Sequence, residues 1–161
     1  MATSILVRPN IPDSVRLLKE LDREQFPLTA AFWPFPESTG RDWHLVISSA
    51  LVDREGGLPA YQRIQRALRN LPDIRISVAD IVAVGTNDPV VRSLQDLMPA
   101  GFAPDDFQVA VDLPKRMERE TTVRLPGYVS YAPYLAEGAS EVTVYVHRLV
   151  PRERAGKGRT A

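Results

Sequence analysis

Cysteine is absent from the sequence, and its absence excludes disulfide bonds, thiolate metal sites and cysteine nucleophiles. The apolar runs are all far shorter than the roughly 18–20 residues that a membrane-spanning helix needs. The opening segment, MATSILVRPN, also lacks the basic stretch and the long apolar stretch of a signal peptide. We therefore expect a cytoplasmic protein that does not associate with a membrane.

The chain also has no overall excess of positive or negative charge. The 20 basic and 20 acidic side chains give a formal net charge of +0 at pH 7, so no overall field attracts nucleic acid or anionic lipid. The end of the chain is a local exception, because its ionisable side chains are mostly basic and it has no large apolar residue. We predict a single domain over residues 1–150, followed by a basic disordered tail over residues 151–161.

Recognisable catalytic and ligand-binding motifs are lacking too. The chain has no Gly-x-Ser-x-Gly turn, no glycine-rich phosphate loop, and no His-x-His or Asp-x-Asp pair. Acidic residues at predicted strand ends and loops could assemble a hard-metal site, but this placement is equally typical of solvated or capping carboxylates. These acids are Asp42, Asp53, Glu55, Asp80 and Asp88. We predict no catalytic residue, no metal site and no cofactor.

The segment from Asp42 to Val84 indicates the fold most clearly. Residues 42–52 alternate like a strand and carry apolar side chains on both faces, which is typical of a covered, central strand. Residues 59–71 have helical spacing, with an inward stripe of Tyr61, Ile64, Leu68 and Leu71. Residues 76–84 form a second apolar strand. Because a helical crossover joins parallel strands, we predict that residues 76–84 lie parallel to residues 42–52.

The remaining elements complete a mixed sheet. Asp13 is expected to cap a first helix, residues 28–35 to form a strand that leads through a hairpin into the next, and Thr86 or Asn87 to cap a later helix. Four further strands are expected at residues 107–113, 121–125, 128–135 and 141–150. We predict a single α+β domain with a mixed β-sheet of five to seven strands, about three helices packed on it and a strand-rich C-terminal half.

His44 and His147 are the only side chains expected to titrate near neutral pH, and each lies in a predicted strand. Two strand-borne histidines invite comparison with the two-histidine phosphoesterases, in which each strand carries His-x-Thr or His-x-Ser. Here the triplets are His-Leu-Val and His-Arg-Leu, so the phosphate-binding hydroxyls are missing. A small hydrolase or phosphoesterase around His44 and His147 is our third hypothesis, and packed or surface histidines are the alternative.

A basic helix face supports a second hypothesis, association with nucleic acid. With the apolar stripe of residues 59–71 turned inward, Arg63, Arg66 and Arg69 are predicted to face outward, and no acid lies between residues 58 and 71. This face could track a phosphate backbone together with arginines that follow it or lie in the tail. These additional residues are Arg75, Arg152 and Arg154. A solvated helix face and a frayed tail are the alternative.

Aromatic residues gather beside prolines in two places, and such clusters are typical either of protein interfaces or of core cover. The residues are Phe32, Trp33, Phe35, Tyr128, Tyr131 and Tyr134. The strand EVTVYVHRLV could also pair with a second copy or a partner strand if it ends the sheet. Our leading hypothesis is therefore a non-catalytic interaction or accessory module that forms a homo-oligomer, or binds a protein partner, through a strand edge and an aromatic-proline surface.

The strings DWHLVISSALVDREGGLPAYQRIQRAL and ISVADIVAVGTNDPVVRSL resemble a pattern found in small uncharacterised bacterial proteins. In that pattern an aromatic hairpin and a strand ending in Leu-Val-Asp precede a Tyr-x-x-Ile-Gln helix, and a further strand leads to an Asn-Asp-Pro helix start. The resemblance covers about residues 28–98. It implies a bacterial, cytoplasmic origin and brings no activity or site with it.

Overall fold

The computed structural model describes residues 9–36, 42–97, 106–112 and 140–151. Its helices are α1 (Ile11–Arg23), α3 (Ala50–Glu55), α4 (Gly57–Arg69) and α5 (Pro89–Leu97), with a 3₁₀ turn η1 (Val78–Asp80). Its strands are β1 (Leu28–Pro34), β2 (Leu45–Ser49), β3 (Ile81–Val84), β4 (Phe107–Asp112) and β5 (Glu141–Leu149). No helix of these ranges is long and apolar enough to cross a bilayer.

The described strands form one mixed sheet in the order β3-β2-β1-β5-β4. Strand β2 pairs in parallel with β3, whereas the β1–β2, β1–β5 and β4–β5 pairs are antiparallel. The predicted β-α-β unit is confirmed, because β2 and β3 are joined through α3 and α4 and lie parallel. The α+β class and the mixed sheet are confirmed with it.

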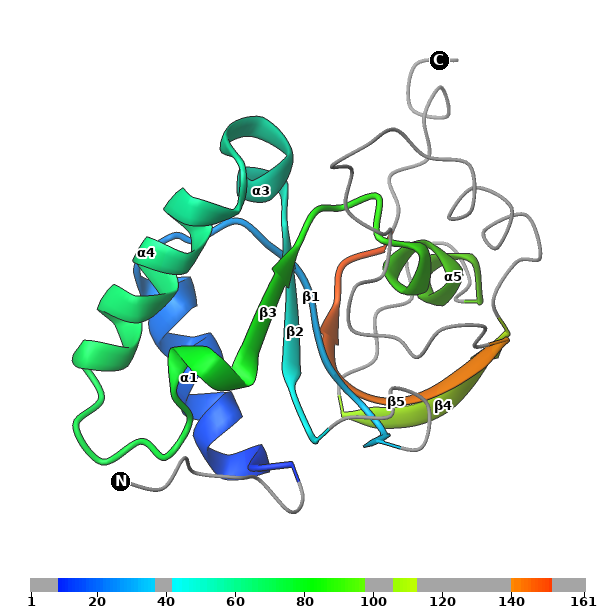
Figure 1. Ribbon diagram of the computed structural model, residues 1–161, viewed down its shortest axis with the longest axis horizontal. Helices are drawn as coiled ribbons and strands as arrows, with labels where there is room; N and C mark the ends of the chain where they lie inside the picture. The colour runs from blue at the N-terminus through cyan, green and yellow to red at the C-terminus, as the bar shows by residue number, and fades with distance from the viewer. Residues whose placement is uncertain (1–8, 37–41, 98–105, 113–139, 152–161) are drawn as a thin grey trace.

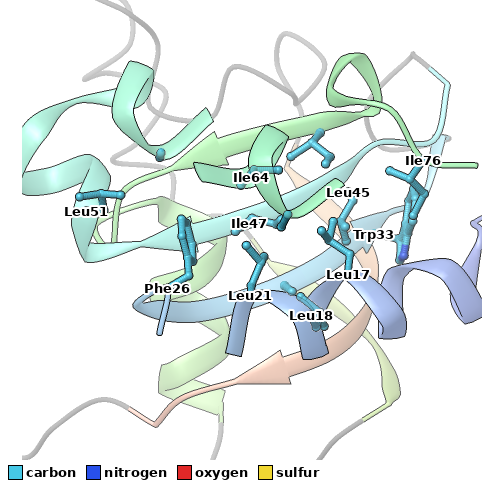
Figure 2. Close-up of a cluster of buried hydrophobic side chains, with 14 residues drawn as sticks. Leu17, Leu18, Leu21, Phe26, Trp33, Leu45, Ile47, Leu51, Ile64 and Ile76 are labelled. Atoms are coloured by element: carbon cyan, nitrogen blue, oxygen red, sulfur yellow. The ribbon is translucent and has the colours of Figure 1, made fainter. Parts of the chain in front are cut away.

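Helices cover both faces of the sheet (Figure 1). On one face, α1 and α4 pack over β1, β2 and β3, and this core includes the fully buried Leu17, Trp33 and Ile64 (Figure 2). On the other face, α5 packs over β4 and β5 through a core rich in valine. The central strands therefore have apolar side chains on both faces. This agrees with the covered, central strand predicted for residues 42–52.

The contact face of α4 differs from the predicted stripe. Its fully buried side chains are Ala60, Ile64 and Ala67, whereas Tyr61 and Leu68 are half-buried at the sides of the helix. Small alanine side chains let the helix axis lie close to the sheet, so the longer side chains flank the contact instead of forming it. The helix itself and its position across β2 and β3 agree with the prediction.

Three predicted boundaries were wrong, each because a side chain caps a helix or turn. Strand 42–52 ends at Ser49, whose hydroxyl accepts a hydrogen bond from the Leu51 N–H and starts α3. Strand 76–84 begins only at Ile81, because a Ser77–Asp80 capping box forms η1 before it. The first helix is capped by Asn10, since the Asp13 N–H donates to the Asn10 side chain.

The N-cap of α5 was also misplaced. Asp88 performs this role instead of Thr86 or Asn87, because one of its carboxylate oxygens accepts hydrogen bonds from the backbone N–H groups of Val90 and Val91. The expected strands at 121–125 and 128–135, like most of the expected tail, lie outside the described residues.

Strand β5, which contains most of EVTVYVHRLV, was expected as a possible edge. That expectation was wrong, because β5 lies between β1 and β4. Within the described residues the two outer strands are β3 and β4.

Candidate functional site

A buried serine and a buried histidine are linked in series with an exposed aspartate where α1 meets the sheet. The Ser14 Oγ lies 2.6 Å from Nε2 of His147, and Nδ1 of the same ring lies 3.2 Å from Oδ1 of Asp106. The indole N–H of Trp33 points to the same place, 3.2 Å from His147 Nε2 and 3.4 Å from Ser14 Oγ. Helix α1, strands β1 and β5, and the residue before β4 thus meet at one polar cluster, which we call the His147 cluster.

Hydrogen-bond complementarity decides the tautomer of His147. The Asp106 carboxylate is an acceptor, so Nδ1 must carry the proton and donate to it. In the neutral ring Nε2 is then an acceptor for the N–H of Trp33, and it shares the single proton of the Ser14 hydroxyl with the Ile11 carbonyl, 2.9 Å from Ser14 Oγ. The order of groups is that of a serine-hydrolase triad, with a histidine oriented by a carboxylate and facing a hydroxyl.

The same groups lack the access that nucleophilic catalysis needs. Ser14 has 0% exposed surface and His147 has 4%, so a substrate carbonyl has no path to the hydroxyl. The neighbouring amides are already used, because the Ser14 N–H donates to the Asn10 carbonyl and the Asp13 N–H to the Asn10 side chain. These amides are therefore not available as an oxyanion hole. The His147 cluster joins elements of the fold and is closed to substrate.

Burial dominates the acid–base behaviour of this cluster. Desolvation lowers the pKa of His147, although the hydrogen bond and the charge of Asp106 act in the opposite direction, and the nearby Arg148 lowers it further. Tyr145 packs edge-on against the imidazole, with ring centroids 5.2 Å apart. Burial, followed by the Asp106 charge, raises the pKa of the Tyr145 hydroxyl. His147 is thus held in its neutral form at neutral pH.

Sequence inspection missed Ser14 and Asp106 as partners of His147. A signal for Ser14 was present: it lies three, four and seven residues before Leu17, Leu18 and Leu21, so it belongs to the buried face of α1. For Asp106 no signal was available, because its contact depends on β4 pairing with β5. Asp106 adopts a φ of 55°, a left-handed conformation that is uncommon outside glycine and turns the chain into β4.

His44 has a different environment. Its side chain is half-buried, and Nδ1 lies 2.8 Å from the Asp42 carbonyl just before β2. Within the described part of the chain, His147 contacts Ser14, Trp33, Asp106 and Tyr145, and none of these contacts includes His44. These contacts therefore do not bring the two histidines together, as the chemistry of a two-histidine phosphoesterase requires.

The predicted arginine face is only partly exposed. Arg63 is half-buried, since its guanidinium donates to the Glu24 carbonyl at 2.9 Å and lies 5.5 Å from the Phe26 ring centroid. The prediction that Arg63 faces outward was wrong, because the C-terminal end of α1 packs against that side of α4. Arg66, Arg69 and Arg75 are exposed, whereas Arg152 and Arg154 lie outside the described residues.

Two carboxylates at the C-terminal end of α1 contact the C-terminal end of α4. Asn70, the C-cap of α4, donates to Glu20 and Glu24 at 3.0 Å each. The pKa of Glu20 is lowered to about 2, mainly by hydrogen bonds from Arg23 and Asn70, so this carboxylate is ionised at neutral pH. Arg23 pairs with both carboxylates, so Glu20, Arg23 and Glu24 together bring one net negative charge to this end of α4.

The proposed aromatic interface was wrong for two of its residues. Phe32 and Trp33 have 0% exposed surface and belong to the two cores, because β1 is covered on both faces. Phe35 is half-buried and packs edge-on against Trp43, with ring centroids 4.8 Å apart. Tyr128, Tyr131 and Tyr134 lie outside the described residues.

The outer edge of β3 is closed by the protein itself. The Ala83 N–H, which points away from β2, donates to the Tyr61 hydroxyl of α4 at 2.9 Å. The Ile81 N–H donates to the Val78 carbonyl, and beyond the strand the Thr86 N–H donates to the Asp53 carboxylate. A strand that approached this edge would find its main donors occupied.

The outer edge of β4 differs in this respect. The Thr143 carbonyl accepts from the Phe35 N–H, so residues 143 and 145 of β5 direct their backbone groups to β1. Residues 142, 144 and 146 must then bond to β4, at Val111, Val109 and Phe107. The backbone groups of Gln108, Ala110 and Asp112 therefore point outward, and within the described ranges no strand lies beside them.

Within these ranges no group of three or more histidine or acidic side chains is placed to hold a metal ion. Comparison of the chain with protein-family models, with curated proteins and with solved structures finds no match.

Proposed function

We propose that this protein is a non-catalytic interaction module of the bacterial cytoplasm, which binds a second chain by adding a strand to the outer edge of β4. The observation that carries the proposal is the outward direction of the backbone groups of Gln108, Ala110 and Asp112 at an edge whose side chains there are exposed. An extended segment could pair with these groups through main-chain hydrogen bonds, which supply affinity in strand addition.

The contrast between the two outer strands supports this choice of edge. Natural sheets protect their edges with proline, charged side chains, bulges or covering elements. Strand β3 uses covering elements, namely Tyr61 and the η1 turn. Strand β4 has no proline and no charged residue between Phe107 and Val111, and its first charged residue is Asp112 at the end.

The closed His147 cluster is consistent with a non-catalytic role. Its serine is inaccessible, yet its histidine connects α1 to Asp106, the residue that leads into β4. A hydrogen-bonded network with a buried centre stiffens the elements that it joins. It would hold the start of β4 in a fixed position for pairing, and the lack of cysteine suits a reducing cytoplasm.

Substitution of Ala110 by proline tests the proposal. Proline removes the outward N–H of residue 110 but no hydrogen bond of the β4–β5 ladder, and edge strands accept proline at such positions. We expect Ala110→Pro to abolish association measured by size-exclusion chromatography with light scattering and by pull-down with identified partners. Ala110→Thr, which keeps the N–H and favours strands, is the matched control. Association that is equal in Ala110→Pro and wild type would contradict the proposal.

A further inference from the structure

The sequence of β4 is complementary to itself when two copies run antiparallel with Ala110 on the two-fold axis. In that register Gln108 faces Asp112 of the second copy, Ala110 faces Ala110, and Asp112 faces Gln108. All three residues direct their N–H and C=O outward, so each of the three cross-strand pairs can exchange two backbone hydrogen bonds. We infer that the partner of the β4 edge is a second copy of this chain, joined in this register into one continuous sheet.

Side chains on both faces fit this register. On the face covered by α5, Val109 would lie opposite Val111 of the second copy, and both valines already belong to or pack against the valine-rich core. Cross-strand pairs of β-branched residues stabilise antiparallel sheets. The apolar layer under α5 would thus continue across the axis without a polar residue in it.

On the opposite face, Asp112 has an unfavourable neighbour that the second copy would offset. Within the chain Asp112 is paired across the ladder with Glu141, and both side chains are exposed. Like charges directly opposite each other destabilise a sheet. In the dimer the Gln108 amide of the other copy would lie on the other side of Asp112, where its N–H groups can donate to the carboxylate.

Two other registers are poorer. A two-fold axis at Asp112 would place two carboxylates face to face, and an axis at Gln108 would leave Ala110 and Asp112 without cross-strand partners among residues 107–112. The register with Ala110 on the axis uses all three outward residues and places Val109 and Val111 in non-hydrogen-bonded pairs, where facing side chains lie closest. An isologous contact of this kind closes on itself and limits the assembly to a dimer.

The experiment compares charge variants by sedimentation equilibrium up to about 1 mM protein. Gln108→Asp places a second carboxylate opposite Asp112, and symmetry makes this happen twice in each dimer. We expect it to weaken the dimer about 2- to 30-fold, from the usual range of cross-strand pair energies applied twice. Gln108→Lys should tighten the dimer by a similar factor. The double variant Gln108→Asp with Asp112→Lys should return the dissociation constant to near the wild-type value.

The inference rests on the proposed function, and the two can fail separately. A chain that stays monomeric up to about 1 mM, or a dimer in which the double variant gives no recovery, overturns the inference. If such a monomer still binds a purified partner and Ala110→Pro removes that binding, the proposed edge function stands without the dimer. If Ala110→Pro changes no association of any kind, both are wrong. Circular dichroism and thermal unfolding of each variant distinguish lost pairing from lost folding.

Discussion

The hydroxyl of Tyr61 provides a direct test of the claim that the β3 edge is closed. Tyr61→Phe removes only the oxygen that accepts the Ala83 N–H, 2.9 Å away, and leaves the ring in its place against the sheet. A typical intramolecular hydrogen bond contributes a net free energy of about 0.5–1.5 kcal/mol. We therefore expect the free energy of unfolding to fall by about 1 kcal/mol, because the Ala83 N–H is left without its partner at a partly buried edge.

Amide hydrogen exchange measures this effect at the group concerned. A loss of about 1 kcal/mol in local stability corresponds to roughly fivefold faster exchange of the Ala83 N–H. The Ile81 N–H is an internal control, since its acceptor is the Val78 carbonyl and not the tyrosine. Equal protection of Ala83 in Tyr61→Phe and wild type would refute the idea that α4 blocks this edge, and the preference for β4 would lose its main support.

Two further predictions concern other contacts of the fold. Because burial lowers the pKa of His147, the unfolded chain binds more protons than the folded chain just below the ordinary histidine pKa of about 6.5. The free energy of unfolding should fall as the pH drops below about 6.5, and His147→Phe should reduce this slope in urea titrations; an equal slope in both proteins would exclude His147 as its source. Gly85→Ala should cost about 0.5–1.5 kcal/mol, since a Cβ there would displace the exposed Asp53 carboxylate from its hydrogen bonds to Thr86. The cost should be smaller in an Asp53→Ala background, and an unchanged cost in chemical denaturation would contradict this explanation.

The β2–α4–β3 unit was predictable because its signals are local. Alternation of apolar side chains over two faces identified a covered strand, and helical spacing identified the crossover that makes the next strand parallel. The errors within this unit were errors of a few residues, at Ser49 and Ile81. Capping side chains decide such boundaries, and their hydrogen bonds are formed only once the helix and the strand are in place.

The candidate site was much less predictable. Phe32 and Trp33 looked like interface residues beside prolines, but two helical layers bury them from opposite faces. Arg63 lies on the side of its helix opposite the apolar stripe, so the helical pattern alone predicted that it faces solvent. The packing of α1 against α4 instead brings its guanidinium into contact with the Glu24 carbonyl. Ser14, His147 and Asp106 come from three distant segments, so only the strand order brings them together.

Strand order also decided which edge of the sheet can bind a partner. EVTVYVHRLV and FQVAVD both read as β-branched strands, and nothing in either segment indicates which of them is central. By itself the sequence determined the element types, the α+β class and the parallel β2–β3 pair, because periodicity within a dozen residues reflects which side chains avoid water. Only the tertiary structure decided the neighbours of each strand and the burial of Ser14 and His147, because those depend on contacts between distant segments of the chain, such as the pairing of β1 with β5 and the contact of Ser14 with His147.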